Sequence, residues 1–242
     1  MEIEIDDEEG TDVPRQSLLD VVLEHKQKQS SQARLEDRIT LLAKTKDMQE
    51  DDEEIRDYFL DLFDLAATED ETCTGLVLVY PTACVVVLEA EQSILWDVLR
   101  RLHSSELDNS PVNEFAILSS SEEISKRVFN MPYSTFLNEA SAPAVLIEDS
   151  EKLIATATAA NLSILKLGEK LRSLPGDEAQ NLLANLRSSM TTFPTQETFK
   201  AIIGAEDTSS VDEFLEFFGK PVDISLDSEV VWPAPEALEA HL

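Results

Sequence analysis

The chain has 242 residues, of which 43% are hydrophobic, so it can bury a core within one medium-sized domain that carries extensions. Asp and Glu number 49 against 19 Lys and Arg, and the resulting net charge of −30 argues against binding to nucleic acid or to an anionic membrane surface. No apolar run is long enough to span a membrane. The acidic first residues lack the apolar centre of a signal peptide, so we expect a cytoplasmic protein.

The N-terminal region separates into two segments. Residues 1–13 carry seven acidic side chains and are expected to form a disordered tail. Pro14 can open a helix, because proline is favoured at a first helical position, and apolar residues within 18–23 form its stripe. Residues 14–37 are therefore assigned to an N-terminal helix and a linker.

The predicted core begins with a strand over 38–44 and a helix that starts near Asp51. The stretch 74–102 then predicts a strand, a tight turn at Pro81 and Thr82, a second strand and a helix. Neither strand alternates between apolar and polar residues, which indicates that both are covered on two faces. The helix at the end of this stretch has one apolar stripe, formed by Ile94, Leu95, Val98, Leu99 and Leu102.

A strand is predicted over 112–118, and a short further strand is predicted within 127–136. Pro132 removes a hydrogen-bond donor there and so favours the edge of the sheet. The order β, α, β, β, α, β is that of a ferredoxin-like α+β fold, a mixed sheet with two helices on one face. The other face of such a sheet needs a cover.

The residues that follow supply helices for this second face. A helical region from about 150 to 174 is broken by Pro175-Gly176, and another helix follows, so residues 141–190 are assigned as capping helices. The first of these helical regions contains Leu153, Ile154, Ala157, Leu162, Leu165, Leu167 and Leu171, and we expect these helices to pack on the exposed face of the sheet. Residues 191–242 are assigned to an acidic C-terminal tail that is partly helical and then extended.

No constellation of residues indicates catalysis or a metal site. The three histidines lie far apart in the sequence, and Cys73 and Cys84 have no histidine near them. The chain has only six glycines and no glycine-rich loop that could cradle a phosphate. The sequence therefore predicts neither an enzyme nor a bound metal.

Two apolar features are candidate partner contacts. Trp96 lies on the predicted helix of the stretch 74–102 and is interpreted as a helix-to-helix or partner contact. Val230, Val231 and Trp232 form an apolar cluster in the acidic tail. Such a cluster either folds onto the protein's own core or docks into another chain, and the sequence leaves both possibilities open.

Several short motifs resemble those of the BLUF domain, a flavin-based blue-light sensor fold. The motifs lie at the ends of predicted strands and in the loop before the last one: Thr74-Gly75, Leu88-Glu89, and Lys126 and Arg127 with Phe129. The runs TGLVLVYPT and VLEA are also similar to a BLUF-like group of vertebrate testis-expressed proteins. The resemblance implies a BLUF-like domain over 38–140, followed by the family's sheet-capping helices.

The departures from the BLUF pattern concern the flavin site. In BLUF domains a tyrosine, an asparagine and a glutamine form hydrogen bonds around the flavin ring. Those places fall on Ala43, near Thr68 and on Val86, and the places of a later tryptophan and methionine fall near Pro132 and Ser134. Alanine has no hydroxyl and valine no amide, so polar atoms of a flavin would be left unpaired. The resemblance thus implies a BLUF-like fold that has no flavin cofactor and has lost photochemistry.

The similarity to the testis-expressed group implies a non-enzymatic structural or adaptor protein of a motile cilium or sperm flagellum axoneme. Its expected partners are other proteins, such as radial spokes or the nexin–dynein regulatory complex, and the docking surfaces are the acidic tails and the outer helix faces. Two alternatives stay open. One is a ligand- or flavin-binding sensor module of BLUF type, and the other is an acylphosphatase-like enzyme, for which the sequence lacks a glycine-flanked anion loop.

Overall fold

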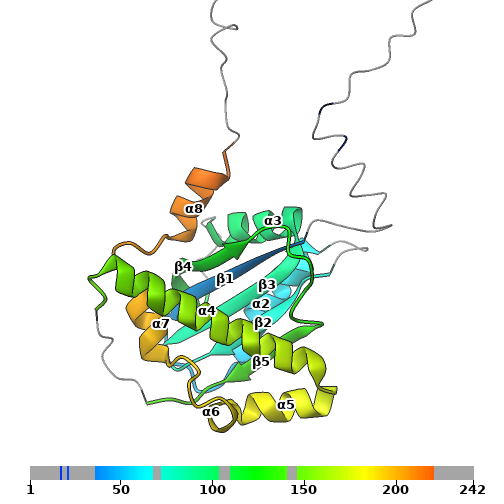
Figure 1. The fold of residues 1–242 in the computed structure, drawn as a ribbon, viewed down its shortest axis with the longest axis vertical. Helices are drawn as coiled ribbons and strands as arrows, with labels where there is room; N and C mark the ends of the chain where they lie inside the picture. Colours follow the sequence, from blue (N-terminus) through cyan, green and yellow to red (C-terminus); the bar gives the residue numbers. More distant parts are fainter. Residues whose placement is uncertain are drawn as a thin grey trace, which may run out of the picture. The chain divides into compact units, whose positions relative to one another are not determined.

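Five strands form one mixed sheet in the computed structural model, in the order β4-β1-β3-β2-β5 (Figure 1). The structure describes Ser17, Val21 and residues 36–67, 72–103, 110–140 and 146–220. The strands are β1 (Glu36–Thr45), β2 (Thr74–Val79), β3 (Ala83–Glu91), β4 (Val112–Ser121) and β5 (Pro132–Phe136). β1 pairs antiparallel with β3 and β4, β2 pairs antiparallel with β3, and β5 runs parallel to β2. The predicted ferredoxin-like α+β fold is confirmed.

The β2–β3 hairpin occupies the centre of the sheet, as its uninterrupted apolar residues predict. The amide of Tyr80 donates a hydrogen bond of 2.8 Å to the carbonyl of Ala83, which places Pro81 and Thr82 in the turn. Every residue of β2, and every residue of β3 except its last, Glu91, is buried. Helices cover both faces of these strands, which explains why their sequence does not alternate.

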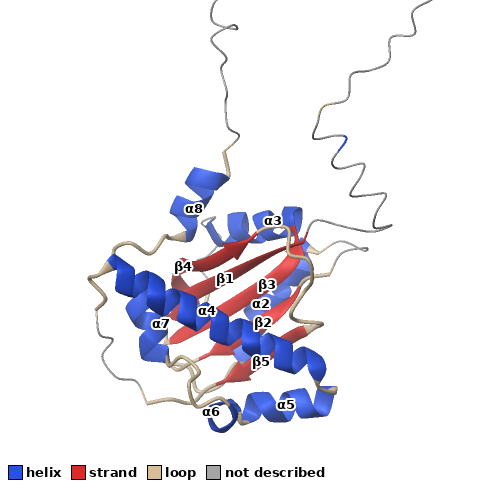
Figure 2. Cartoon of the chain, viewed as in Figure 1, coloured by secondary structure: helices blue, strands red, loops and turns tan. Residues whose placement is uncertain are grey.

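The two edges of the sheet are β4 and β5 (Figure 2). Pro132 is the first residue of β5 and is paired with Gly75 of β2. The predicted edge position of this strand is thus confirmed, and the proline lies where its missing donor costs least. β4 extends to Ser121, three residues beyond the predicted strand.

One face of the sheet is covered by α2 (Glu53–Ala66) and α3 (Gln92–His103). The buried residues of α3 are the five of the predicted stripe. Ile55, Phe59 and Phe63 of α2 enter the same core. These helices and the sheet enclose the first of two apolar cores.

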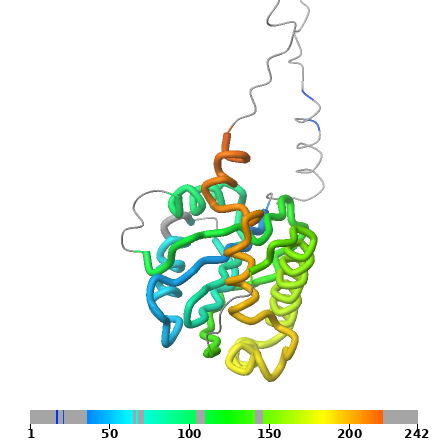
Figure 3. The backbone as a smooth tube through the Cα atoms, turned by 90° about the vertical axis from the view of Figure 1, so that its left-hand side faces the viewer, coloured from blue at the N-terminus to red at the C-terminus, as the bar shows by residue number. Residues whose placement is uncertain are grey.

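The opposite face is covered by four helices, and the turned view of Figure 3 separates this layer from the sheet. They are α4 (Ser150–Ser173), α5 (Gly176–Ala184), α6 (Leu186–Ser189) and α7 (Gln196–Ile203). Their apolar residues pack with Leu76, Leu78 and Val87 of the sheet in a second core. A cover of this second face by helices is what the sequence predicts.

The apolar residues of α4 do not all face the sheet. Ile154 and Leu162 are exposed, whereas Ala160, Ile164 and Gly168 are buried. Apolar and small residues occur all around the first half of this helix, so the sequence does not fix which side faces the sheet. Gly168 decides the phase, because a Cβ atom there would lie 2.8 Å from Cζ of Phe129.

The segment 191–220, which the sequence assigns to a tail, adds two helices to the fold. α7 contributes Phe199, Ala201 and Ile202 to the core under α4. α8 (Val211–Phe218) packs on the other core through Val211. α7 and α8 therefore lie on different sides of the sheet, although they follow one another in the chain.

Several of the sequence expectations fall on residues outside the described part. These are the acidic tail 1–13, most of the N-terminal helix and linker, Thr68, and residues 221–242 with Val230, Val231 and Trp232. Within the N-terminal helix, the amide of Val21 donates to the carbonyl of Ser17 at 3.1 Å, which is the spacing of one helical turn.

Candidate functional site

Ala43 and Val86 lie on the neighbouring strands β1 and β3, on the face of the sheet that α2 and α3 cover. Ala43 is paired with Cys84, and Val86 is paired with Leu41, so the two side chains are diagonal neighbours. Each is only 1% exposed and belongs to the core beneath these helices. The structure therefore brings together two of the three places that the BLUF resemblance assigns to flavin contacts.

The surroundings of Ala43 and Val86 are apolar. The residues of β1, β2 and β3 in this core are aliphatic or cysteine: Ile39, Leu41, Val77, Val79, Cys84 and Leu88. Phe59 of α2 is fully buried above them, with the rings of Phe63 and Phe115 at 6.1 and 6.5 Å. Burial raises the pKa of the Cys84 thiol to about 12, so the thiol stays neutral.

This core does not fit a flavin ring. A flavin presents several carbonyl and ring-nitrogen atoms that need hydrogen-bond partners. At the centre of this face, Ile39, Leu41 and Ala43 of β1 lie beside Cys84, Val86 and Leu88 of β3, and none of these six side chains offers an amide, hydroxyl or charged group to a flavin. Ser134, at a place of the BLUF pattern, is bonded instead to the carboxylate of Asp52 at the start of α2.

The motifs that carry the BLUF resemblance meet at one end of the sheet, on the side of α4. Glu89 is fully buried and accepts a hydrogen bond of 2.5 Å from Nε of Arg38. Its carboxylate also accepts bonds of 2.9 Å from the backbone amides of Val128 and Phe129. Glu89 of β3 thus binds the loop before β5 to the middle of the sheet through hydrogen bonds.

Arg127 and Phe129 complete this attachment. Arg127 donates to Glu36 and to the carbonyl of Thr72, each at 2.8 Å. Phe129 is fully buried and packs against Gly168 of α4. Because each polar group here is bonded within the chain, the motifs stabilise the fold rather than offer groups to a substrate.

A row of aromatic rings begins at α3 and continues along α8. Trp96 stacks on Phe214 with ring centres 5.9 Å apart and an interplanar angle of 24°. Phe218 lies 4.8 Å from Phe214, and Phe217 lies 4.9 Å from Phe218. Phe217 is 79% exposed and Phe218 is 57% exposed. We call Trp96, Phe214, Phe217 and Phe218 the aromatic row.

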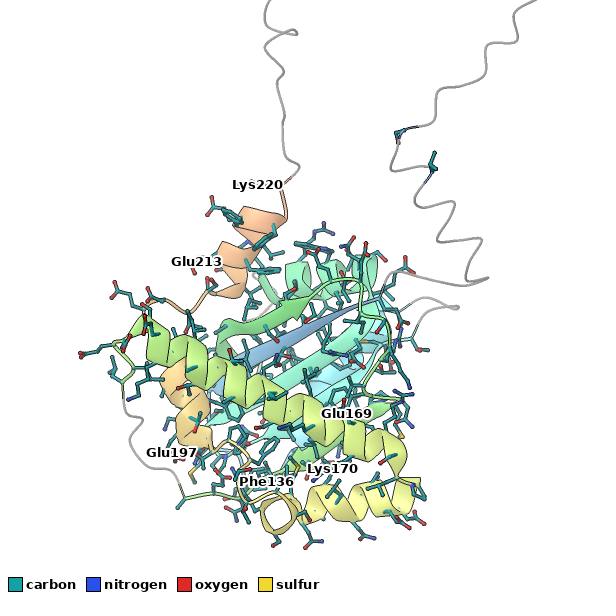
Figure 4. The ribbon with its side chains drawn as sticks, in the orientation of Figure 1. Phe136, Glu169, Lys170, Glu197, Glu213 and Lys220 are labelled. Carbon is teal, nitrogen blue, oxygen red and sulfur yellow. The ribbon has the colours of Figure 1, made fainter. Side chains whose placement is uncertain are left out.

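The helix that carries this row is anchored at its N-terminal end. Ser210 and Glu213 form a capping box, and the amide of Ile117 on β4 donates to the carbonyl of Ser209 at 2.9 Å. Nδ1 of His103 on α3 lies 2.6 Å from Oδ1 of Asp212. α8 is therefore held at its first turn, while Phe217 and Phe218 in its last turn are exposed. Figure 4 labels Glu213 in the first turn of this helix and Lys220 just after its end.

The predicted partner contacts have different outcomes. Trp96 makes the helix-to-helix contact that was one of its two interpretations, whereas Val230, Val231 and Trp232 lie outside the described residues. Sequence reasoning did not single out Phe217 and Phe218. The signal was present, because five apolar residues among the eight of α8 are more than one face of a short helix can bury.

Two features of the described residues bear on other functions. No group of three or more His, Cys, Asp or Glu side chains is placed to hold a metal ion in that part of the chain. None of the described helices is both long and apolar enough to cross a membrane. Glu89, the most deeply buried carboxylate described, is already saturated by donors from its own chain.

Comparison with known proteins gives a family and a set of solved structures. A family model described as testis-expressed protein 47 matches residues 35–220. The chain is similar to the BLUF structure of BlrP1 (from Klebsiella pneumoniae) with 11% identity and a TM-score of 0.32, over 43% of this chain and 65% of that one. It thus spans just under two thirds of that chain.

Two further solved structures are covered almost completely. BlsA in its ground state is 15% identical, with a TM-score of 0.33, over 69% of this chain and 96% of that one. BlrB, a BLUF protein in its dark state, is 15% identical, with a TM-score of 0.29, over 71% and 98%. At these identities and scores, the similarity describes related folds and carries no statement about function.

Proposed function

Because the chain belongs to the testis-expressed protein 47 family, we propose that it is a non-enzymatic adaptor in the axoneme of a motile cilium or sperm flagellum. It docks other proteins, such as components of radial spokes or of the nexin–dynein regulatory complex, through the outer faces of its helices. The family's expression in testis supports this setting, since sperm flagella are assembled there. The absence of a fitting environment for a flavin between α2, α3 and the sheet supports a role other than photochemistry.

The aromatic row is the observation that carries this proposal. Large exposed aromatic side chains are costly in water and are enriched where proteins bind one another. Phe217 and Phe218 are the C-terminal end of a stack whose other members already pack in the protein. A partner that covers them would extend an existing apolar contact rather than build a new one.

The charge of the molecule indicates the chemistry of such a partner. α8 carries Asp212, Glu213 and Glu216, and the whole chain has a net charge of −30. A basic segment is therefore favoured, because long-range attraction speeds its approach and arginine can stack on phenylalanine rings. The acidic surface of a tubulin lattice is disfavoured for the same reason.

The test is recovery of partners from flagellar extract with the full-length chain. Cross-linking mass spectrometry after recovery should identify axonemal proteins bound to the wild type. The double variant Phe217→Ala/Phe218→Ala should lose them, while its fold, measured by circular dichroism, is unchanged because both rings are exposed. Met48→Ala and Leu146→Ala are matched controls, since these side chains are 70% and 69% exposed and lie outside the row.

Three results would count against the proposal. Recovery of no axonemal protein by the wild-type chain would remove the adaptor role. A rise in melting temperature together with blue-light absorbance after incubation with flavin would favour the alternative of a flavin-binding sensor module. Loss of the axonemal proteins by the control variants as well would show that the contact does not depend on the aromatic row.

A further inference from the structure

α4 has an outward face without charge, which is unusual in this protein. Thirteen consecutive residues, 153–165, carry no charged side chain, although 28% of the chain is charged. We use the name α4 outer face for the exposed residues Ile154, Ala155, Thr158, Ala159 and Leu162. Ile154 is 65% exposed and Leu162 is 50% exposed, and no described residue of this chain covers them.

The polar groups beside the α4 outer face are already bonded within the helix. The hydroxyl of Thr156 donates to the carbonyl of Lys152 at 2.7 Å, and that of Ser163 donates to the carbonyl of Ala159 at 2.8 Å. These hydroxyls therefore give up little hydrogen bonding to water when another surface covers them. The small side chains of Ala155 and Ala159 also allow a second helix to approach closely.

The two ends of this face have opposite charge. Glu148, Asp149 and Glu151 lie at the N-terminal end, whereas Lys166 and Lys170 lie at the C-terminal end, where Figure 4 labels Lys170 and its neighbour Glu169. The side chains of Glu151, Lys166 and Lys170 form no ion pair with any other residue that the structure describes. Lys152 also lies at the N-terminal end and Glu169 at the C-terminal end, so it is the net charges of the two ends that have opposite sign, with the apolar centre between them.

We infer that the α4 outer face binds a second copy of this chain, with the two α4 helices antiparallel and related by a two-fold axis at Thr158. Residues at equal distances from Thr158 then face one another, so Ile154 of each copy meets Leu162 of the other. Glu151 of one copy then lies opposite the residue before Lys166 of the other copy, so Glu151 and Lys166 can form an ion pair between the copies. By symmetry this ion pair occurs twice. A surface that is complementary to itself in this way is what a two-fold dimer requires.

The size and charge of this contact set its strength. One helix face buries less than the roughly 800 Å² per partner of a stable interface, so the dimer should be weak and dependent on concentration. Two copies of net charge −30 repel each other, but ions screen this repulsion beyond about 8 Å at physiological salt. The inference goes beyond the proposed function, because an adaptor can act as a monomer or as a dimer.

Sedimentation equilibrium of the full-length chain at physiological salt, over micromolar to submillimolar concentrations, tests the inference. The wild type should pass from monomer to dimer. Glu151→Lys and Lys166→Glu each place like charges at two symmetry-related contacts, so each should weaken the dimer about tenfold. The double variant Glu151→Lys/Lys166→Glu restores opposite charges at the same places and should return the wild-type behaviour.

Matched controls distinguish the effect of the local contact on dimerisation from the effect of the total charge of the chain. Lys220→Glu changes the net charge from −30 to −32, as Lys166→Glu does, and Glu216→Lys changes it to −28, as Glu151→Lys does. Glu216 lies on α8 and Lys220 lies just after it, away from α4, so both controls should leave the dimer unchanged. A wild type that stays monomeric, or a double variant that dimerises no better than the single variants, would overturn the inference. The recovery of axonemal proteins is measured separately, so its outcome does not depend on this one.

Discussion

Replacing Glu89 by alanine should be among the most damaging single changes in the sheet. Glu89 is fully buried and belongs to the Leu88-Glu89 motif. Its carboxylate accepts from Nε of Arg38 at 2.5 Å and from the amides of Val128 and Phe129 at 2.9 Å. Alanine would leave these three donors without a partner in a region that water does not reach.

The magnitude follows from the groups that lose their acceptor. An unsatisfied buried donor costs about 1–3 kcal/mol, and removing one partner of a buried ion pair costs about 3–5 kcal/mol. These costs overlap, because Arg38 can turn toward the carbonyl of Lys126, which it already contacts at 3.4 Å. We therefore expect Glu89→Ala to lower the free energy of unfolding by about 4 kcal/mol, a large share of the total for a domain of this kind.

Urea denaturation followed by circular dichroism measures this loss. Glu89→Gln keeps one acceptor oxygen and should lose about half as much, whereas Glu216→Ala removes only an exposed pair with Lys220 and should cost less than about 0.5 kcal/mol. Hydrogen exchange should also become faster at the amides of Val128 and Phe129. A loss below about 1 kcal/mol for Glu89→Ala would refute the reasoning, since the buried donors would then have found other partners.

Two further predictions concern close packing and ionisation. Gly75→Ala should destabilise the fold by about 3 kcal/mol in thermal denaturation, because its Cβ atom would lie 1.9 Å from the carbonyl oxygen of Val87, whereas Gly176→Ala, with no atom within 4 Å, should be neutral or stabilising. Burial raises the pKa of the Cys73 and Cys84 thiols from 9.0 to about 12, so the folded chain keeps protons that the unfolded chain releases. The contribution of these thiols to stability is therefore complete below pH 9 and is lost as the pH rises toward 12. At pH 8, both thiols should react with iodoacetamide roughly a thousandfold faster in urea than in the native chain, because the unfolded chain has that much more thiolate. Equal rates in the two states would contradict the burial of the thiols.

The order of helices and strands along the chain, and the cover of both sheet faces by helices, could be predicted because local patterns indicate them. The unbroken apolar runs of β2 and β3 indicated strands covered on both faces, and the stripe of α3 matched its buried residues. Pro132 indicated an edge because a proline lacks a donor. In each of these cases a few neighbouring residues determine which side of the element is buried.

The parts that could not be predicted depend on contacts between distant segments. The role of Glu89 requires the backbone amides of Val128 and Phe129, about forty residues later in the chain. The exposure of Phe217 depends on how much of α8 the edge of β4 and α3 can cover. The periodicity of α8 does not determine whether Phe217 is exposed, because the elements that pack against α8 decide how much of its surface is buried.

The core under α2 and α3 links the fold to the proposed function. A cofactor pocket needs polar groups within an apolar wall, and such groups destabilise a core in which they have no partner. With Ala43 and Val86 at the centre, this face of the sheet instead packs like an ordinary core around Phe59. The described strand residues at the centre of this core offer no hydrogen-bond donor or acceptor from an amide, hydroxyl or carboxylate side chain, whereas the apolar surface at Phe217 and Phe218 and on the α4 outer face lies outside both cores. The departures from the flavin-site pattern and the exposed apolar surfaces that support the proposed docking thus both follow from where the apolar side chains of this chain lie.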